Sequence, residues 1–197
     1  FYRLFGVAII FDHHDLFTEN IAYRFKGILG RVFYSVARLC EYFTFKTANI
    51  VISTNESYKR IAIDRANLKE PKVFVVRNGP KINDFTPVKP DPRLKQGHRF
   101  MICYVGVMAE EDGVLEFAEV IKHIVFDFAR TDILFSLIGD GAARGQVVKK
   151  LNSLGLMQHM DLPGMIRDDK VLRRHMSAAD VFVSPEPLTP MNLKSTL

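Results

Sequence analysis

The chain has 197 residues, of which 48% are hydrophobic and 25% charged, a balance that excludes a disordered or collagen-like protein. No apolar run reaches the roughly 18 residues that a membrane-spanning helix needs, and no export signal is visible. Two cysteines, Cys40 and Cys103, are too few for a disulfide framework. We expect both to be buried thiols in a reducing compartment, which predicts a cytoplasmic location.

The net charge of +5 is unevenly distributed. Residues 1–97 contain 16 Lys and Arg against 9 Asp and Glu, whereas residues 98–197 contain 11 against 13. A basic first half favours an anionic partner, such as nucleic acid, a phosphate group or an anionic membrane face. A solvated basic surface without any partner explains the same charge.

In the first half of the chain, apolar runs of strand length alternate with helical patterns. Asn55 or Ser57 can cap the second helix. The next stretch, residues 78–97, contains four prolines and two glycines, which is the composition of a linker. In chain order, the pattern predicts a strand at 5–11, a helical region at 17–46 broken near Gly27 and Gly30, a strand at 48–53, a helix ending near residue 68 and a strand at 72–77.

The alternation then restarts, and its strands are apolar throughout, as in parallel sheets that are buried on both faces. The pattern predicts strands at 99–106, 132–139, 158–163 and 179–185, with helices at 113–129, 144–154 and 167–178. We therefore predict an α/β protein with two incomplete Rossmann-like domains whose parallel sheets face a cleft. The predicted boundaries are 1–79 for the first domain, 80–98 for the linker and 99–197 for the second domain.

In an open parallel sheet, ligands bind outside the carboxyl ends of the strands. Five segments of the sequence follow predicted strands and so meet at such edges. They are "DHHD" at 12–15, "NGP" at 78–80, "GVMAEEDG" at 106–113, "GDGAARG" at 139–145 and "SPEPLTPMNLKST" at 184–196.

The segment "DHHD" admits three interpretations. A metal site is the weakest, because adjacent histidines on an extended chain point in different directions and no third ligand has the usual spacing. The sequence also lacks an Asp-x-Asp pair, so we expect no metal or other cofactor. The histidines can instead serve in acid–base or positioning chemistry. The structural alternative is a strand end at which Asp12 or Asp15 caps the next helix.

Glycine-rich turns in the second half are compatible with phosphate binding through backbone N–H groups. Gly139, Gly141 and Gly145 come close to a dinucleotide-binding pattern without completing it, and such turns also occur for packing alone. Gly106 opens a loop that offers acidic rather than basic side chains. Lys194, with the hydroxyls of Ser195 and Thr196, supplies a basic group after the last strand.

Residues 23–46 contain five Lys and Arg, one acidic residue and seven Phe and Tyr. Val32, Val36, Leu39 and Phe43 lie at helical spacing, and we expect them to form a face toward the core. A basic aromatic helix can also lie on an anionic membrane surface. Both interpretations remain open at the level of sequence.

Taken in order, these segments resemble the family 4 (group 1) glycosyltransferases of the GT-B fold. "FDHHDLFTE" is similar to the family stretch D-x-H-D-x-x-P-E, and "VVRNGP" followed by "FTPV" is similar to V-x-N-G with a later F-x-P. "YVGVMAEEDGV", "FSLIGDG", "SAADVFVSPEP" and "PMNLKST" also have family counterparts. The resemblance covers nearly the whole chain, and the subgroup it is most similar to acts in bacterial surface-polysaccharide assembly.

The resemblance implies transfer of a sugar from a nucleotide-diphosphate sugar, without a metal, to a glycan or lipid-linked acceptor and not to nucleic acid. The donor is then held mainly by the second domain and the acceptor by the first. The resemblance assigns catalytic roles to His14, Asp15 and Glu19, cleft-lining roles to Asn78 and Gly79, and donor-binding roles to Gly106, Gly139, Gly141, Lys194, Ser195 and Thr196.

Some residues depart from the family pattern. Val107 and Asp112 stand where many members carry Arg and Lys, and Thr18 replaces a proline. The chain also lacks the family's first glycine-rich loop and its final acidic helix, so we expect a fragment of a longer protein that is inactive alone. Two alternatives remain, a nucleotide-sugar epimerase and a non-catalytic binding module of the same fold.

Side-chain alternation separates the two histidines of "DHHD". On an extended chain, neighbouring side chains point to opposite sides, so only one histidine can face a site. The family register favours His14, which directly precedes Asp15, and Asp15 is expected to orient it. His13 is then expected to pack inside its own domain.

Overall fold

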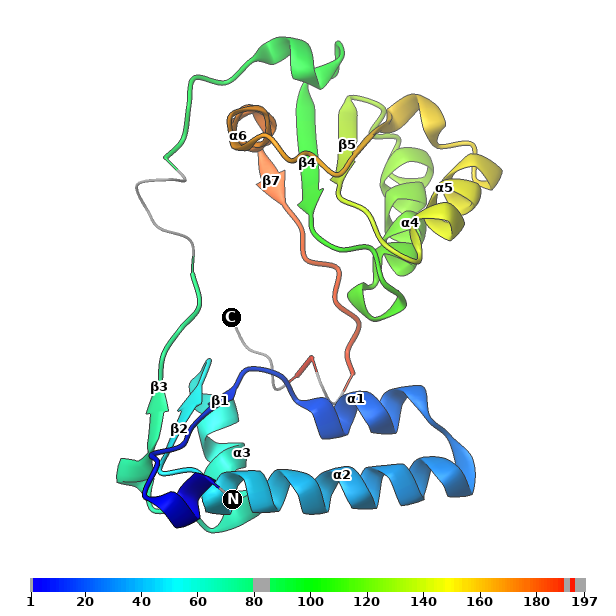
Figure 1. Cartoon of the computed structure of the whole chain (residues 1–197). Helices are drawn as coiled ribbons and strands as arrows, with labels where there is room; N and C mark the ends of the chain where they lie inside the picture. Colours follow the sequence, from blue (N-terminus) through cyan, green and yellow to red (C-terminus); the bar gives the residue numbers. More distant parts are fainter. Residues whose placement is uncertain (1, 80–85, 190–191, 194–197) are drawn as a thin grey trace. The chain divides into compact units, whose positions relative to one another are not determined.

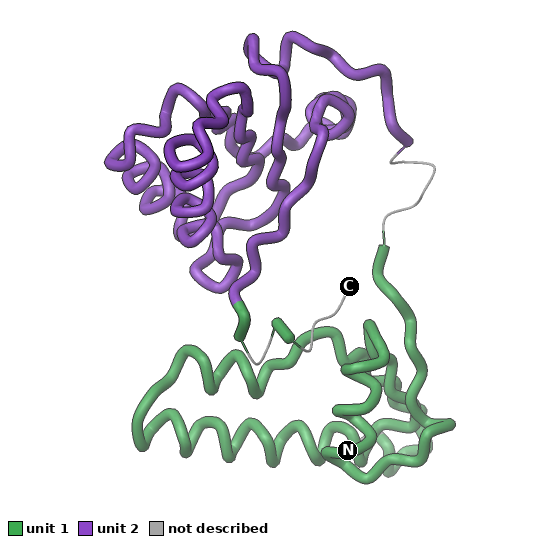
Figure 2. The backbone as a smooth tube through the Cα atoms, turned by 180° about the vertical axis from the view of Figure 1, so that it is seen from behind, with its two compact units in different colours: residues 1–79, 188–197 green, residues 80–187 purple. Residues whose placement is uncertain are grey.

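The computed structural model describes residues 2–79, 86–189 and 192–193. The chain divides into two compact units (Figure 2). Unit 1 comprises Phe1–Gly79 with Leu188–Leu197, and unit 2 comprises Pro80–Pro187. Each unit contains a parallel sheet with helices, which confirms the predicted α/β class. None of the described helices is long and apolar enough to span a membrane.

Unit 1 is built on a parallel sheet in the order β1-β2-β3, with helices packed beside it (Figure 1). Short 3-10 turns precede β1 and β3. The elements are β1 (Ile10–His13), α1 (Phe17–Arg24), α2 (Gly27–Thr47), β2 (Ile50–Ser53), α3 (Glu56–Ala66) and β3 (Val73–Val75). Asn55 is the residue that caps α3, since its side chain accepts a hydrogen bond from the Tyr58 amide at 2.8 Å.

Strand β1 lies later in the chain than the apolar pattern predicts. The prediction of a strand at 5–11 is wrong at both ends, because β1 begins at Ile10 and ends at His13. Gly6 follows a 3-10 turn with a φ of 74°, a left-handed conformation that an extended run cannot contain. His13 pairs in register with Ser53 of β2, so it belongs to the strand, and only His14 and Asp15 follow it.

The predicted break in the long helical region is confirmed, and two glycines produce it. Gly27, with a φ of 75°, begins α2 after the extended residue Phe25. Gly30 lets the two helices approach, because a Cβ there would lie 2.3 Å from the Phe25 carbonyl oxygen. The result is a hairpin of α1 and α2 with a tight turn.

The core of unit 1 is small, and much of α2 lies outside it. The buried cluster consists of Phe45, Ala48, Val51, Ala62, Ala66, Leu68 and Val73. The expected core face of α2 is wrong for the described residues, because Val32, Val36, Leu39 and Phe43 are all more than half exposed. Helix α2 instead buries Gly30, Ala37 and Phe45, which lie on the side turned toward α1 and the sheet.

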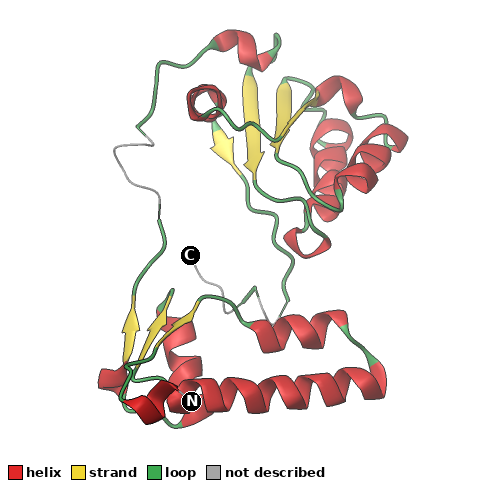
Figure 3. Ribbon diagram, in the orientation of Figure 1, coloured by secondary structure: helices red, strands yellow, loops and turns green. Residues whose placement is uncertain are grey.

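Unit 2 contains a sheet with helices beside it (Figure 3). The sheet is parallel, and its strands lie in the order β6-β5-β4-β7. Its elements are β4 (Phe100–Val105), α4 (Val114–Lys122), β5 (Ile133–Ile138), α5 (Arg144–Ser153), β6 (Met160–Gly164), α6 (Asp169–Ala178) and β7 (Val181–Phe182). A π-helical turn, His123–Asp127, extends α4. The strands predicted from continuous apolar runs are present, and all six residues of β5 are buried.

Both faces of the unit 2 sheet are covered. On one face, Phe117 and Ile121 of α4 pack with Leu151 of α5 against Phe135. On the other face, Met101 and Leu134 pack with Ala178 of α6 and with Leu94. This two-sided burial explains why the strands read as unbroken apolar runs.

The second part of the predicted linker packs on unit 2. Asp91 caps a 3-10 turn, Pro92–Lys95, and forms an ion pair with Arg174 of α6 at 2.8 Å. The Val88 amide donates a hydrogen bond to Ser177 Oγ at 3.0 Å. These contacts fix the approach of the chain to β4.

The two cysteines differ in environment. Cys103 is buried in β4, and burial raises the pKa of its thiol to about 12. Cys40 lies exposed on α2. The prediction of two buried thiols is therefore right for Cys103 and wrong for Cys40.

Candidate active site

The two adjacent histidines, His13 as the last residue of β1 and His14 just after it, occupy opposite environments, as strand alternation predicts. His13 is only 2% exposed, with its ring 5.0 Å from that of Phe45 and 5.4 Å from that of Tyr58. Burial lowers the pKa of His13, so its imidazole is neutral near pH 7. His14 is exposed. The expected packing of His13 inside its own unit is confirmed.

Asn78 holds the ring of His14. The Asn78 amide nitrogen lies 2.9 Å from His14 Nδ1. The same amide nitrogen lies 3.2 Å from His14 Nε2. Because an amide nitrogen only donates, the ring nitrogen that it bonds is an acceptor, and the geometry fits either ring nitrogen in that role. These residues follow β1 and β3, the outer strands of a parallel sheet, so the fold joins two strand ends that are 64 positions apart. Gly79, the next residue, has no neighbour within 4 Å of where a Cβ would lie.

Asp15 does not act as a helix cap. The residue that precedes α1 is Leu16, and no side chain caps that end of the helix. The alternative in which Asp12 or Asp15 caps the next helix is therefore wrong. Among the described residues, no hydrogen bond joins Asp15 to His14, and Asp15 borders a cavity instead. Its catalytic role stays a prediction.

Glu19 lies in a nearly buried cluster of charges at the base of α1. The Arg65 guanidinium bonds Glu19 and also Glu41 of α2, the latter at 3.0 Å. Arg38 pairs with Glu41, and Thr18 Oγ1 donates to Glu19 at 2.7 Å. Burial alone would lower the pKa of Arg65, because it disfavours the charged form. The hydrogen bond to Glu19 and the attraction to Glu41 outweigh burial, so the pKa of Arg65 lies above its usual value. The cluster ties α1 to α2 and α3.

In this structure, Glu19 helps to hold α1 in place through the charge cluster. Its side chain is 11% exposed, and its carboxylate is engaged by Arg65 and Thr18. A chemical role for Glu19 itself stays a prediction. The sequence pattern does not point to Arg65 directly. The one indirect indication is Glu41, a single acidic residue in a basic helix, which requires a basic partner.

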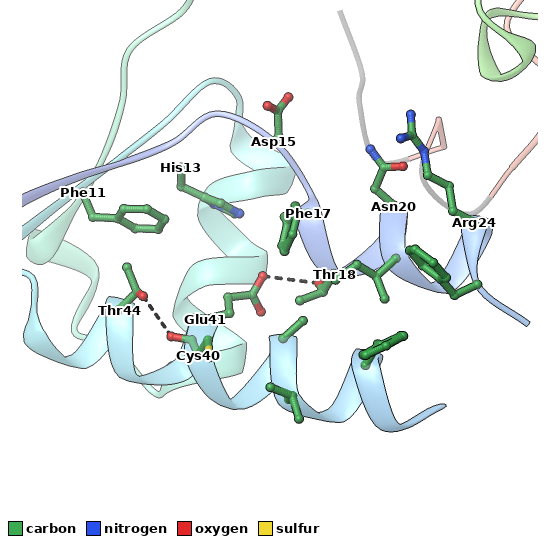
Figure 4. A pocket seen from close by; sticks show the side chains of 15 residues that line it. Phe11, His13, Asp15, Phe17, Thr18, Asn20, Arg24, Cys40, Glu41 and Thr44 are labelled. Atoms are coloured by element: carbon green, nitrogen blue, oxygen red, sulfur yellow. Dashed lines mark hydrogen bonds between the residues drawn. The ribbon is translucent and has the colours of Figure 1, made fainter. Parts of the chain in front are cut away.

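A cavity of about 720 Å³ opens between α1 and α2 (Figure 4). Its walls are mainly apolar side chains of the two helices. Its polar lining includes His13, Thr18 and Glu41, together with Asp15, Asn20 and Arg24. No group of three or more His, Cys, Asp or Glu with metal-binding geometry is found in the part of the chain that the structure describes.

The glycines of unit 2 allow two loops to pack closely. A Cβ on Gly139 would lie 1.8 Å from the Gly106 carbonyl oxygen, and one on Gly141 would lie 2.4 Å from that of Met108. The Gly106 amide donates to Ile138, the Gly139 amide to Gly164 and the Gly141 amide to the side chain of Asp140. These N–H groups are used inside the unit, so donor binding by the three glycines stays a prediction. Lys194, Ser195 and Thr196 lie outside the described residues.

Comparison with known proteins finds relatives that cover both halves of the chain. Residues 99–195 match the family model described as "Glycosyl transferases group 1". The chain is also similar to a curated protein of Escherichia coli, UDP-Gal:alpha-D-GlcNAc-diphosphoundecaprenol alpha-1,3-galactosyltransferase. The identity is 25% over 173 residues, which cover 82% of this chain and 44% of the relative. Residues 99–195 are thus similar to the group 1 glycosyltransferases.

Solved glycosyltransferase structures share the fold of this chain. HepE of Anabaena, solved with UDP, has a TM-score of 0.65 at 17% identity, over 98% of this chain and 52% of that one. TarM of S. aureus has a TM-score of 0.60 at 16% identity, over 74% of this chain and 27% of that one. These similarities confirm the GT-B fold. The chain spans about half the length of these relatives or less.

Proposed function

We propose that the longer protein to which this chain corresponds transfers a sugar from a nucleotide-diphosphate sugar to a glycan or lipid-linked acceptor. The observation that carries the proposal is the pairing of His14 with Asn78 at the carboxyl ends of β1 and β3, where the fold places ligands. The E. coli relative is named for a UDP-galactose donor and a diphosphoundecaprenol-linked acceptor. HepE has been solved with UDP-glucose.

The roles of the two halves follow from the same proposal. Residues 1–79 form the acceptor side, residues 80–98 the linker and residues 99–197 the donor side. The family match, which covers 99–195, supports a common function for that half. The setting is bacterial surface-polysaccharide assembly, as in the subgroup whose sequence motifs this chain resembles.

The chemistry needs a positioned polar group beside the reacting sugar. The acceptor hydroxyl oxygen bonds to the anomeric carbon, the bond from that carbon to the diphosphate breaks, and the nucleoside diphosphate leaves with the electron pair. The hydroxyl proton is released as the new bond forms. His14, exposed at the strand end and held by Asn78, can form a hydrogen bond with a sugar or acceptor oxygen during this exchange. The proposal includes no metal.

Kinetics of the longer protein test the function. We expect His14→Ala to lower kcat by roughly 10²–10⁴-fold, the usual loss for a positioned acid, base or hydrogen-bond donor. Asn78→Ala should lower kcat by a smaller factor, because the ring stays but loses its orientation. His123→Ala, in an exposed turn of unit 2, is the control and should leave turnover unchanged.

The controls also separate the alternatives. Sugar release that needs no acceptor would indicate an epimerase or hydrolase instead of a transferase. An unchanged kcat in the His14 variant would remove this residue from the reaction. Activity that disappears with a chelator and returns with a divalent ion would contradict the metal-free part of the proposal.

The longer protein is also proposed to contact an anionic membrane face through residues 23–46. Helix α2 exposes Ile28, Leu29 and Val32, and Arg31 lies in the same turn. Exposed apolar side chains beside basic ones favour the boundary between lipid headgroups and acyl chains. A lipid-linked acceptor would reach the enzyme from such a surface.

A further inference from the structure

Unit 1 has a second pocket at the edge of its sheet that lies opposite to His14 and Asn78. The sheet is parallel, and these two residues follow the carboxyl ends of β1 and β3. The second pocket has a volume of about 490 Å³ and lies where the chain enters the sheet, because Asn49 directly precedes β2 and Lys72 directly precedes β3. The residues that line this basic pocket are Lys46, Asn49, Asn67, Leu68, Lys69, Pro71 and Lys72.

The lining of the basic pocket carries positive charge without any acidic side chain. Its charged groups are Lys46, Lys69 and Lys72. In the described part of the chain, no ion pair joins any of these lysines to an acidic residue. Glu70, the next acid along the chain, pairs with Lys59 at 3.3 Å and so does not compensate them.

The structural alternative is that these cations only stabilise the carboxyl ends of helices. Arg3 donates to the carbonyl oxygens of Lys46 and Thr47, both at 2.9 Å. Lys72 Nζ donates to the carbonyl oxygen of Phe45 at 3.2 Å, and the residue that caps α3 also lines the pocket. Each helix end carries only about half a negative charge, so α2 and α3 together offset roughly one of the four positive charges and leave about three.

The pKa of Lys72 reflects this excess of positive charge. Burial lowers the pKa of Lys72, and the positive charges of Arg3 and Lys46 lower it further. An ammonium group beside a carboxylate shows the opposite effect, because the negative charge favours its protonated form. A bound anion would therefore relieve the repulsion among the cations of the pocket.

Two side-chain amides add neutral hydrogen-bond donors. Asn49 Oδ1 accepts from the Ile9 amide at 2.9 Å, while its nitrogen has no partner among the described residues. The side chain of Asn67, which follows α3, likewise has no partner in the described ranges. A phosphate group carries up to about two negative charges and three acceptor oxygens at neutral pH, which suits this set of donors better than a single carboxylate does.

We propose that the basic pocket binds an anion that carries a phosphate group, either a soluble phosphate compound or the phosphate of a lipid headgroup. The ammonium groups of Lys46, Lys69 and Lys72 balance its charge, and the amides of Asn49 and Asn67 bond its oxygens. The inference does not depend on the proposed transferase function, because the pocket lies at the amino ends of the strands and its test needs no sugar transfer.

Binding of inorganic phosphate to the longer protein is the first arm of the test. Phosphate replaces chloride at constant ionic strength, so that general screening stays the same. Lys69→Gln with Lys72→Gln removes two charges of the pocket, and Lys149→Gln with Lys170→Gln removes two exposed charges of unit 2. We expect the Kd for phosphate to rise by about tenfold or more in the pocket variant, because hydrogen bonds to charged groups are lost, and to stay unchanged in the control.

Vesicles form the second arm and distinguish the source of the phosphate. Phosphatidylcholine vesicles with and without phosphatidic acid are compared, and the headgroup phosphate of phosphatidic acid is the probe. Vesicle binding that only the pocket variant loses, without any binding of inorganic phosphate, supports the site and assigns it to a lipid headgroup. If the pocket variant and the control behave alike with both probes, or if neither probe binds the unaltered protein, the proposal is overturned.

Thermal unfolding separates the binding site from the structural alternative. Glutamine at position 72 keeps an N–H donor for the Phe45 carbonyl, so the pocket variant loses charge more than it loses bonding. Without phosphate, its Tm should equal or exceed that of the unaltered protein, because repulsion in the pocket is reduced. The bound probe should raise the Tm of the unaltered protein only. A lower Tm of the pocket variant together with unchanged binding of both probes would show that the lysines serve the helix ends alone.

Discussion

The two units build their interiors differently. Unit 2 buries every residue of β5, and helices cover both faces of its sheet. Unit 1 has a small apolar cluster, a nearly buried group of charges around Arg65 and an α2 helix whose large apolar side chains are mostly exposed. Unit 2 therefore buries the apolar faces of its sheet within the unit, whereas unit 1 leaves apolar side chains exposed and a cavity open.

The proposed function gives the units different tasks. In unit 2, Gly106 and Gly139 bring two loops into close contact, and under that proposal this edge serves the donor. In unit 1, the open cavity and the exposed face of α2 can adapt to an acceptor and to a surface. Ion pairs between Arg65 and two glutamates join the helices of unit 1 in addition to its small apolar core.

The largest effect on stability is expected for the nearly buried charge cluster of unit 1. Arg65→Met leaves Glu19 and Glu41 nearly buried without their partner, and loss of one member of a buried pair costs roughly 3–5 kcal/mol of unfolding free energy. The lower end of that range applies, because the side chains keep slight exposure. Urea denaturation measures the change.

Two further variants make this test specific. Arg130→Met in unit 2 removes an exposed pair with Asp132 and should leave the midpoint of unfolding unchanged. Adding Glu19→Gln and Glu41→Gln to Arg65→Met should restore much of the lost stability, because no buried charge then remains. An Arg65 variant as stable as the Arg130 variant would show that the cluster does not hold unit 1 together.

The next effect concerns the exposed face of unit 1. The double variant Leu29→Ser with Val32→Ser should weaken binding of the longer protein to anionic vesicles by about tenfold or more, because two apolar side chains no longer enter the interface. Added salt should weaken binding of the unaltered protein as well. Vesicle co-sedimentation measures both.

The matched control lies in unit 2. Phe128 is 73% exposed there, and Phe128→Ser should leave vesicle binding unchanged if the surface of unit 1 alone is responsible. Equal losses in the two proteins, or no loss in the double variant, would mean that the exposed apolar residues of α2 do not contact lipid.

The sequence predicted best what depends on local pattern. The buried strand "DILFSLIG" was predicted at 132–139 and is observed at Ile133–Ile138, because a strand covered on both faces has an unbroken apolar run. The split of α1 from α2 was predicted from glycines, whose freedom at positive φ is a local property. The opposite environments of His13 and His14 were predicted from strand alternation.

Prediction from the sequence failed where contacts between distant segments determine the structure. Arg65 bonds Glu19 and Glu41 from 46 and 24 positions away, and no local spacing brings these three residues together. The face of α2 at Val32 and Val36 has core-like periodicity, yet periodicity does not say whether anything covers it. The bonding of His14 to Asn78 was not predicted either, although both positions were placed at strand ends.

The smallest expected effect is a pH dependence that originates in the interior of unit 1. Burial lowers the pKa of His13 below its usual 6.5, while nearby Glu41, Glu19 and Asp12 oppose that shift and Arg65 adds to it. Below pH 6.5 the unfolded chain takes up a proton that the folded chain resists. The contribution of His13 to stability is therefore fully present above pH 6.5 and is lost as the pH falls toward the folded-state pKa.

The measurement is the difference in unfolding free energy between the unaltered protein and His13→Phe, from pH 7.5 to pH 5. Phenylalanine keeps a ring against Phe45 and Tyr58 but cannot titrate. The unaltered protein should lose stability relative to the variant below pH 6.5, by at most about 1.4 kcal/mol per pH unit. His159 of unit 2, whose pKa burial also lowers, is present in both proteins, so its contribution cancels. Parallel curves over the whole range would mean that His13 becomes protonated as easily in the folded unit as in the unfolded chain, which would contradict the lowered pKa of His13.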